Sequence, residues 1–109
     1  MDCLFCKIIK KELESEIVYE NDEVIVVKDI HPKAPIHFLI LPKKHIISVD
    51  HLDVQDKEIS GELLLAAKRI AEGKNIKGYK IVINTGRNGG QLIDHLHLHF
   101  LAGKPIEMP

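Results

Sequence analysis

Histidine and leucine alternate strictly over residues 95–99, in the segment HLHLH. In a β-strand, successive side chains point to opposite faces of the sheet. The alternation would therefore place the three imidazoles on one face and the two leucines on the other, against a core. We predict a strand over residues 95–101 that displays a row of histidines.

The rest of the chain predicts one sheet and one long helix. Apolar runs predict strands over 17–20, 24–27, 37–41 and 79–83, and the first two read as a hairpin with an Asn-Asp turn. Apolar residues at helical spacing predict a helix over 53–72 that stops near Gly73: Ile59, Leu63, Ala66 and Ile70. Since most strands follow one another without a long helix between them, we expect an α+β fold. Its five-stranded sheet would be mostly antiparallel, in a single domain over residues 1–109.

Composition excludes several classes of function. The 15 Lys and Arg residues against 16 Asp and Glu residues give a formal net charge of −1, so the chain lacks the basic field that holds nucleic acid or anionic membrane. No uncharged run exceeds nine residues, far short of the roughly 20 that span a bilayer. The first residues lack the long apolar segment of a secretory signal, so we expect a cytoplasmic protein.

A glycine-rich segment, residues 84–91, separates the last two predicted strands. Its glycines would let the backbone turn tightly and bring N–H groups near a phosphate, with Asn84 at the entrance. A neutral imidazole can attack phosphorus, and neighbouring imidazoles can supply protons or hold its tautomer. Together these features favour phosphoryl transfer through a covalent phosphohistidine. The alternatives are a metal site, because a His-x-His pair can chelate zinc or iron, and a merely solvated polar face.

At this point the sequence resembles the histidine-triad family and, within it, the Hint branch of nucleotide-binding proteins. The resemblance rests on residues 4–9, 29–38, 42–46 and 95–103. Residues 95–101 match the family motif His-φ-His-φ-His-φ-φ, in which φ is apolar, at every position. The resemblance implies a homodimer that joins two five-stranded sheets into one. It also implies hydrolysis of a purine nucleoside phosphoramidate, with an AMP-type nucleotide as the bound group.

The same resemblance assigns roles to individual residues. His97 would attack the α-phosphorus and carry the nucleotidyl group until water hydrolyses it, and His99 would assist the leaving group. His95 and His37 would complete the catalytic set. Asp29 would accept the ribose hydroxyls, although an Asp here is also typical of a turn. The other nucleotide contacts would come from the phosphate-contacting segment and from apolar positions that equally suit a core: Asn84, Gly90, Gln91, Leu4, Phe5, Ile8, Val27 and Ile30.

Two positions depart from the family pattern. Leu92 stands where the Hint branch often has a hydroxyl or another polar residue that contacts the phosphate. Met108 stands where some relatives have an aromatic residue in a tail that helps to choose the leaving group. The first departure affects the expected rate, and the second affects the expected substrate preference.

Cys3 and Cys6 have the spacing of a pair of zinc ligands, and a tetrahedral site needs two more. The resemblance to bacterial members implies that His45 and His95 supply them and that the zinc is structural, with no cofactor required for catalysis. The alternatives are two small buried residues or a thioredoxin-like redox pair. The redox pair is disfavoured because that motif should follow a strand and open a helix, and only two residues precede Cys3.

Three functions therefore remain open. The first is the nucleotidyl hydrolase, and the second is a nucleotide-binding or interaction protein without useful turnover, which only Leu92 favours. The third is a dinucleoside polyphosphate hydrolase, but Fhit-type relatives usually differ at the third triad position or in tail length, whereas His99 is intact. We expect His31 and His51 to be exposed and without a role.

Overall fold

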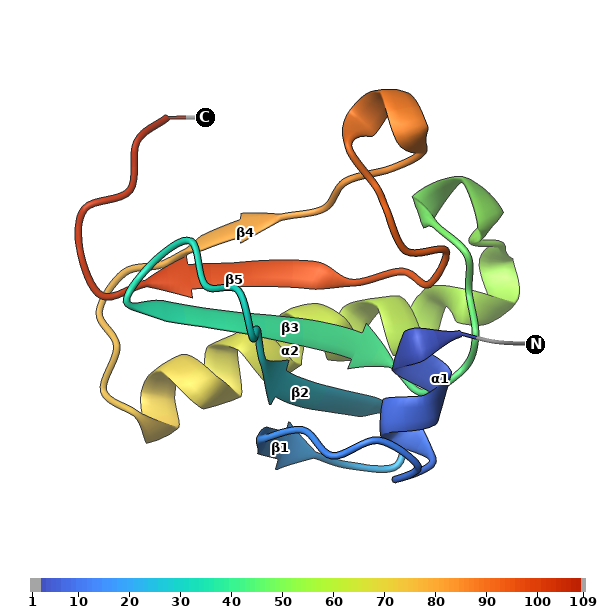
Figure 1. The fold of residues 1–109 in the computed structure, drawn as a ribbon, viewed down its shortest axis with the longest axis horizontal. Coiled ribbons are helices and arrows are strands. Elements are labelled where there is room, and N and C mark those ends of the chain that lie inside the picture. The colour runs from blue at the N-terminus through green and yellow to red at the C-terminus, as the bar shows by residue number, and fades with distance from the viewer. Residues whose placement is uncertain (1–2, 109) are drawn as a thin grey trace.

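The computed structural model describes residues 3–108, and a five-stranded antiparallel sheet with a helix on each face organises it (Figure 1). The strands run in the order β1-β2-β3-β5-β4. The α+β architecture predicted from the sequence is confirmed. The bounds are β1 Ile17–Glu20, β2 Val24–Lys28, β3 Ile36–Pro42, β4 Lys80–Val82 and β5 Leu98–Ala102, with helices α1 Leu4–Ile9 and α2 Lys57–Gly73. No helix within residues 3–108 has the length and apolar character needed to cross a membrane.

Both faces of the central strands are buried, which explains why β2 and β3 read as unbroken apolar runs. Alternate residues pack into two separate cores. The core under α2 contains Val24, Val26, Phe38, Ile40, Leu63 and Ile70, and the core under α1 contains Phe5, Ile25, Val27, Leu39 and Leu41. The α1 face is the one that carries the odd-numbered residues of β3, including His37.

Helix α2 begins four residues later than the sequence predicts. Asp53 and Asp56 form a capping box around a separate 3₁₀ turn over Val54–Asp56, so the α-helix starts only at Lys57. Lys44 donates a 2.6 Å hydrogen bond to Asp56 and holds this turn against the end of β3. Gly73, expected just after the helix, is its last residue.

The prediction for residues 95–101 assigned the side chains to the correct faces of the sheet, but it placed the first residue of the strand too early. Ladder pairing with β3 begins at Leu98, because His95 is drawn into a cluster of side chains beside α1. Residues 93–95 form a bend, in which the His95 amide donates to the Ile93 carbonyl at 2.9 Å, and the Leu96 amide then donates to the Ile46 carbonyl at 2.6 Å. Leu96 and Leu98 lie in the α2 core as expected.

Helix α1 has only six residues and is absent from the sequence prediction. Its N-cap is unusual, because the Cys3 sulfur accepts the Cys6 amide in place of a Ser, Asp or Asn oxygen. A helix this short is unstable alone, so contacts outside α1 must hold it in place.

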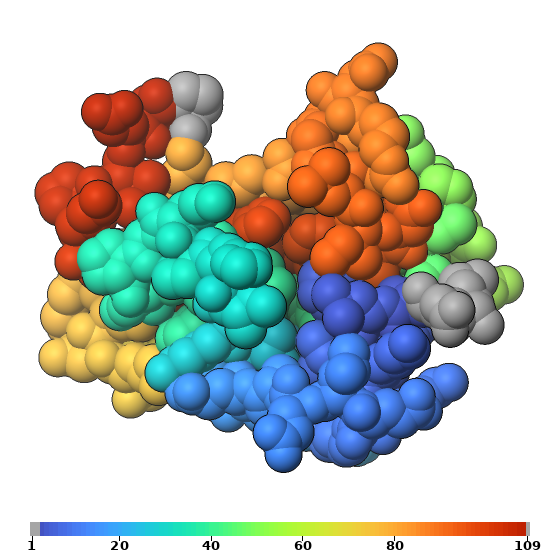
Figure 2. Space-filling view, viewed as in Figure 1, coloured from blue at the N-terminus to red at the C-terminus, as the bar shows by residue number. Residues whose placement is uncertain are grey.

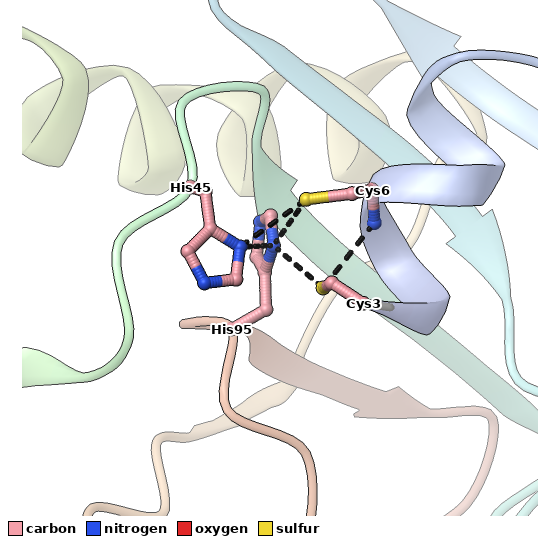
Figure 3. A group of neighbouring side chains, drawn as sticks. All are labelled: Cys3, Cys6, His45 and His95. Carbon is pink, nitrogen blue, oxygen red and sulfur yellow. Dashed lines mark hydrogen bonds between the residues drawn. The ribbon is translucent and has the colours of Figure 1, made fainter. Parts of the chain in front are cut away.

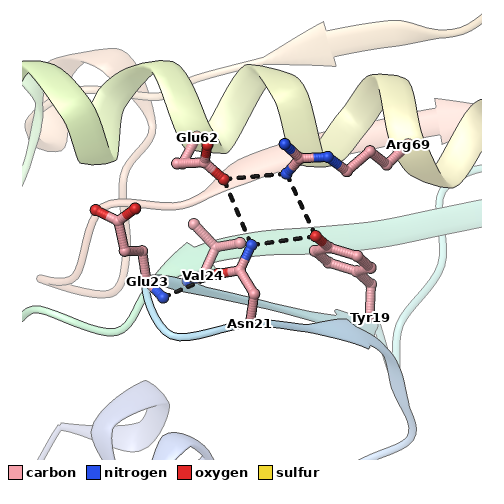
Figure 4. A network of polar contacts seen from close by, with 6 residues as sticks. All are labelled: Tyr19, Asn21, Glu23, Val24, Glu62 and Arg69. Carbon is pink, nitrogen blue, oxygen red and sulfur yellow. Dashed lines mark hydrogen bonds and ion pairs between the residues drawn. The ribbon is translucent and has the colours of Figure 1, made fainter.

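A polar network ties the β1–β2 turn to α2 (Figure 4). Asn21 accepts the amides of Glu23 and Val24 at 2.8 and 2.9 Å, which shapes the turn. Its amide group donates to Tyr19, and Arg69 donates to Tyr19 and to Glu62 at 3.3 and 3.0 Å. The predicted hairpin is therefore fixed to the helix at the back of the sheet, away from the histidines.

Candidate functional site

A cavity of about 690 Å³ opens on the α1 side of the sheet. Figure 2 shows the N-terminal segment (blue), the segment after β2 (cyan) and the loop before β5 (orange) around a hollow on this face. The surface of its wall is mostly apolar, and His37, His97 and His99 lie among its polar residues. The other lining residues used below are Leu4, Phe5, Ile8, Val27, Asp29, Ile30, Asn84, Gly90 and Leu92.

His97 lies at the cavity with one ring nitrogen already engaged. Its Nδ1 is 2.7 Å from the carbonyl oxygen of His95. A carbonyl only accepts, so Nδ1 carries the proton and Nε2 keeps its lone pair. The ring is 8% exposed and is held edge-on against Phe5, with centroids 5.1 Å apart. The arrangement presents an oriented, unprotonated nitrogen, which is what a nucleophile requires.

The tautomers of His37 and His99 follow from a third contact. The Lys33 amide donates to Nδ1 of His37 at 2.9 Å, so the proton of His37 is on Nε2. That N–H points at Nδ1 of His99, 2.9 Å away, and lies 3.3 Å from a carboxylate oxygen of Asp29. His99 therefore accepts at Nδ1 and carries its own proton on Nε2. Asp29 and Nδ1 of His99 therefore both face the single N–H of His37, and Nε2 of His99 remains as the donor of this group.

These three side chains also satisfy a distance criterion for a metal site, since their ligand atoms lie within 4.8 Å of one another. The Lys33 amide argues against metal binding there. Because it occupies Nδ1 of His37, the nitrogen facing His99 is protonated and has no lone pair to offer. The predicted metal alternative for the triad is therefore disfavoured at this position.

The loop before β5 departs from its expected role. Amides of Gly86, Gly89, Gly90 and Gln91 are all used inside the loop, so these four N–H groups are not offered to a phosphate. The Gln91 side chain is 2% exposed and donates to the carbonyls of Ile47 and Ile93. Gln91, predicted to contact the nucleotide, instead braces the loop from within.

A second polar cluster lies beside α1, outside the cavity (Figure 3). Cys3 Sγ is 3.4 Å from Nδ1 of His95, and Cys6 Sγ is 3.2 Å from Nδ1 of His45. Cys6 Sγ is 3.7 Å from the same His95 nitrogen, and the two Nδ1 atoms are 3.2 Å apart. His95 is fully buried, and its Nε2 donates to the Pro42 carbonyl at 2.9 Å. Its Nδ1 lone pair therefore points into the cluster.

Comparison with known proteins identifies the arrangement. The family described as "Scavenger mRNA decapping enzyme C-term binding" matches residues 2–107. The protein HitA of Neisseria gonorrhoeae is 41% identical over 106 residues, 96% of this chain and 98% of HitA. A HIT family hydrolase from Legionella pneumophila Philadelphia 1 is 38% identical with a TM-score of 0.95, over 99% of this chain and 98% of that one.

This chain belongs to the histidine-triad (HIT) family of hydrolases.

Two further HIT structures have informative names. A histidine triad nucleotide-binding protein from Candida albicans is 28% identical with a TM-score of 0.83, over 99% of this chain and 83% of that one. A zinc-bound histidine triad family protein from Mycobacterium smegmatis is 28% identical with a TM-score of 0.84, over 95% of this chain and 76% of that one.

The cluster of the HIT chain fits a zinc ion. In tetrahedral zinc sites the bond lengths place sulfur and nitrogen ligands about 3.6 Å apart and two nitrogens about 3.3 Å apart. The separations of 3.4, 3.2 and 3.7 Å between sulfur and nitrogen, and of 3.2 Å between nitrogens, match these values. Burial, together with Cys3 nearby, raises the pKa of the Cys6 thiol, and a bound dication would reverse this. Cys3, Cys6, His45 and His95 thus indicate a zinc site.

The sequence-derived residues separate into two groups in this HIT fold. His37, His97, His99, Asp29, Asn84, Gly90 and the five apolar residues Leu4, Phe5, Ile8, Val27 and Ile30 line the cavity. His95, predicted for both sites, belongs to the cysteine cluster and does not line the cavity, but its carbonyl contacts His97, which does. The backbone of Lys33 and the carbonyl of Pro42 were missed, because any residue can supply a backbone group. Leu13, Glu14 and Ser15 also line the cavity and carry no motif signal.

The first prediction concerns the metal. The purified HIT chain should hold close to one zinc per chain by elemental analysis, and removal by a chelator should lower Tm by about 10 °C or more. Cys6→Ser should lose the metal, whereas His51→Ala, an exposed histidine outside the cluster, should keep it. An unchanged Tm after metal removal would contradict a structural role.

The second prediction concerns pH. Burial, then His97 and His37, lower the pKa of His99 from 6.5 to about 4, and burial also lowers the pKa of His37. The unfolded chain therefore takes up these protons at a higher pH than the folded chain. The stabilisation is fully present above about pH 6.5 and is lost as pH falls toward 4. Urea titrations of the HIT chain across this range should show a steeper decline for wild type than for His99→Asn. His31→Asn is the matched control, and equal slopes for wild type and His99→Asn would refute the assignment.

Proposed function

We propose that this chain hydrolyses nucleoside phosphoramidates through a nucleotidyl intermediate on His97. One observation carries the proposal: the His95 carbonyl holds a proton of His97 on Nδ1, so the lone pair of the neutral ring is on Nε2, and His97 lines the cavity. The family establishes a histidine-triad hydrolase. The P–N bond is the further step proposed here, together with the AMP-type nucleotide.

In the proposed first step, Nε2 of His97 attacks the α-phosphorus and the P–N bond to the leaving amine breaks. The amine needs a proton as it departs, and Nε2 of His99 would donate it from the form of the ring that holds a second proton, which returns His99 to the neutral state. The Asp29 carboxylate, 3.3 Å from Nε2 of His37, would stabilise the positive charge on the His37–His99 pair before that transfer. Water attacks the nucleotidyl-histidine in the second step, and His99 takes a proton from it.

The low pKa of His99, about 4, affects the two steps differently. It makes the protonated ring a strong proton donor to the leaving amine, and it keeps the ring neutral at pH 7, where it can accept a proton from the incoming water. His97 must also be unprotonated to attack, and its ring meets Phe5 and His99 edge-on.

The nucleotide would lie along the apolar wall, with its base between α1 and β2. Phe5 and Val27 are buried there, and Ile30 is 83% exposed at the rim. Asp29 would accept the ribose hydroxyls, but one of its oxygens already accepts the His31 amide at 2.8 Å. The ribose hydroxyls would then approach the other oxygen, which lies 3.3 Å from Nε2 of His37. The nucleotide-binding relative from Candida albicans supports this use of the cavity.

The zinc of the proposed site supplies no step of the reaction. Cys3, Cys6, His45 and His95 would hold the ion, and their fixed positions would keep in place the His95 backbone that orients His97. The zinc-bound relative from Mycobacterium smegmatis supports this structural use.

One observation favours a second function, nucleotide binding without useful turnover. Leu92 is 83% exposed at the cavity. A leucine side chain has no hydroxyl to offer to a phosphate. Nothing comparable favours cleavage of dinucleoside polyphosphates.

We also propose that two copies associate through β4. This strand is hydrogen-bonded on one side only, at the edge of the sheet, and Tyr79 and Ile83 beside it are 39% and 42% exposed. An edge of this kind is a template for pairing. Light scattering should give a mass near twice 12.3 kDa. A mass of one chain at all concentrations would refute the dimer.

The decisive measurement is release of AMP from adenosine 5′-phosphoramidate. His97→Ala should lose turnover by about 10³-fold or more while it still binds AMP, because only the nucleophile is removed. His51→Ala, the matched substitution at an exposed histidine, should retain turnover.

Two results would contradict the assignment. Turnover that survives in His97→Ala would exclude His97 as the nucleophile, and joint loss of turnover and AMP binding would make its role structural. Wild-type protein that binds AMP without turnover would establish the binding function instead.

A further inference from the structure

Helix α1 serves two sites at once. Cys3 at its N-cap and Cys6 face the polar cluster, whereas Phe5 and Ile8 line the cavity. A six-residue helix has too little stability to hold its own position. Whatever holds the two cysteines therefore also sets the position of the cavity wall.

Phe5 is the physical link between the two sites. It is 3% exposed and meets His95 edge-on at 5.9 Å between centroids and His97 at 5.1 Å. His95 belongs to the cluster, and His97 is the proposed nucleophile. A shift of α1 would move the Phe5 ring away from both, because close-packed interiors transmit such displacements.

The two cysteines are also placed to react with each other. They occupy the N-cap and the third position of α1, their sulfurs lie within 4.8 Å, and the Cys6 amide donates to the Cys3 sulfur at 3.4 Å. Cys6 is partly exposed, whereas Cys3 is 7% exposed. A dissolved oxidant would therefore reach Cys6 first, with Cys3 behind it as the resolving thiol. Figure 3 shows both sulfurs directed to the same point.

We propose that Cys3 and Cys6 are a reversible redox modification site that controls nucleotide affinity. A low-molecular-weight disulfide oxidises the pair, the metal leaves, and α1 with Phe5 loosens over the cavity. The affinity part rests on the proposed function, whereas disulfide formation and metal release do not.

The chemistry balances with that oxidant. The Cys6 thiolate attacks one sulfur of the oxidant, which breaks its S–S bond, releases one small thiolate and leaves a mixed disulfide on Cys6. The Cys3 thiolate then attacks Cys6 Sγ, which forms the internal disulfide and releases the second small thiolate. Two electrons pass from the cysteines to the oxidant. Neither sulfur is then a thiolate ligand, so only His45 and His95 remain for the metal.

The test uses the full, zinc-loaded chain and oxidised glutathione as the probe. Intact mass should fall by two hydrogens, a chromogenic chelator should detect one released zinc per chain, and calorimetry should show AMP binding weakened by about tenfold. With the phosphoramidate substrate, KM should rise more than kcat falls. A dithiol together with zinc should restore all four readouts.

Two variants separate the steps. Cys3→Ser/Cys6→Ser should bind AMP weakly from the start and ignore the oxidant. Phe5→Leu should still form the disulfide and release zinc. Its AMP affinity should change less on oxidation than that of wild type, because the substitution removes the aromatic ring that contacts His97. This variant keeps the redox site intact. Because Phe5 also lines the nucleotide cavity, AMP affinity of the oxidised variant is compared with that of the same variant in its reduced, zinc-loaded form.

Retained zinc, or a stable glutathione adduct without the internal disulfide, would overturn the redox site. Disulfide formation and zinc release with unchanged AMP affinity would overturn the coupling. If reduced, zinc-loaded protein fails to bind AMP, the proposed function fails, and the mass and zinc readouts still decide the redox site.

Discussion

His95 is the residue on which both sites depend, because three of its atoms are committed in different directions. Nε2 donates to the carbonyl that ends β3, which turns Nδ1 toward the cysteines, and the main-chain carbonyl accepts the proton of His97. Each contact fixes the next: the first sets the tautomer, the second anchors α1, and the third exposes a lone pair on the neighbouring ring. A buried imidazole with no free atom is costly to rearrange. This explains why the first histidine of the row can lie outside the cavity and still matter to it.

The sheet could be predicted because its signals are local and redundant. Two patterns predict which face of the sheet a side chain occupies: the alternation over residues 95–99 and the apolar runs of β2 and β3. The residues of the two cores agree with these patterns. Bounds were less predictable where tertiary contacts override a pattern. The Asp53–Asp56 capping box delays α2, and the pull of the cysteine cluster delays β5. Helix α1 has no periodic signal in six residues, and its sulfur N-cap is not among the usual capping groups.

The same distinction, between local sequence signals and contacts made only in the folded chain, applies to the candidate site. Side chains with distinctive chemistry, such as His37 and Asp29, could be named from the sequence through the family resemblance. The proton positions could not, because they depend on main-chain groups of Lys33 and Pro42 that every residue type offers. Gln91 shows the opposite error, since an amide next to glycines is equally suited to bind a phosphate or to satisfy a loop. Only its burial among the carbonyls of Ile47 and Ile93 decides between them.

The self-contained loop before β5 has an evolutionary consequence. Its amides pair within the loop, Gln91 secures it to the body of the protein, and the side chains of Asn84 and Arg87 donate to the carbonyls of Gly89 and Gln91. Asn88 and Leu92 are exposed and make no contribution to that internal pairing in the described structure. Single substitutions there can alter what the cavity mouth accepts without a penalty in folding. The loop is thus a place where new substrate preferences can arise on an unchanged catalytic frame.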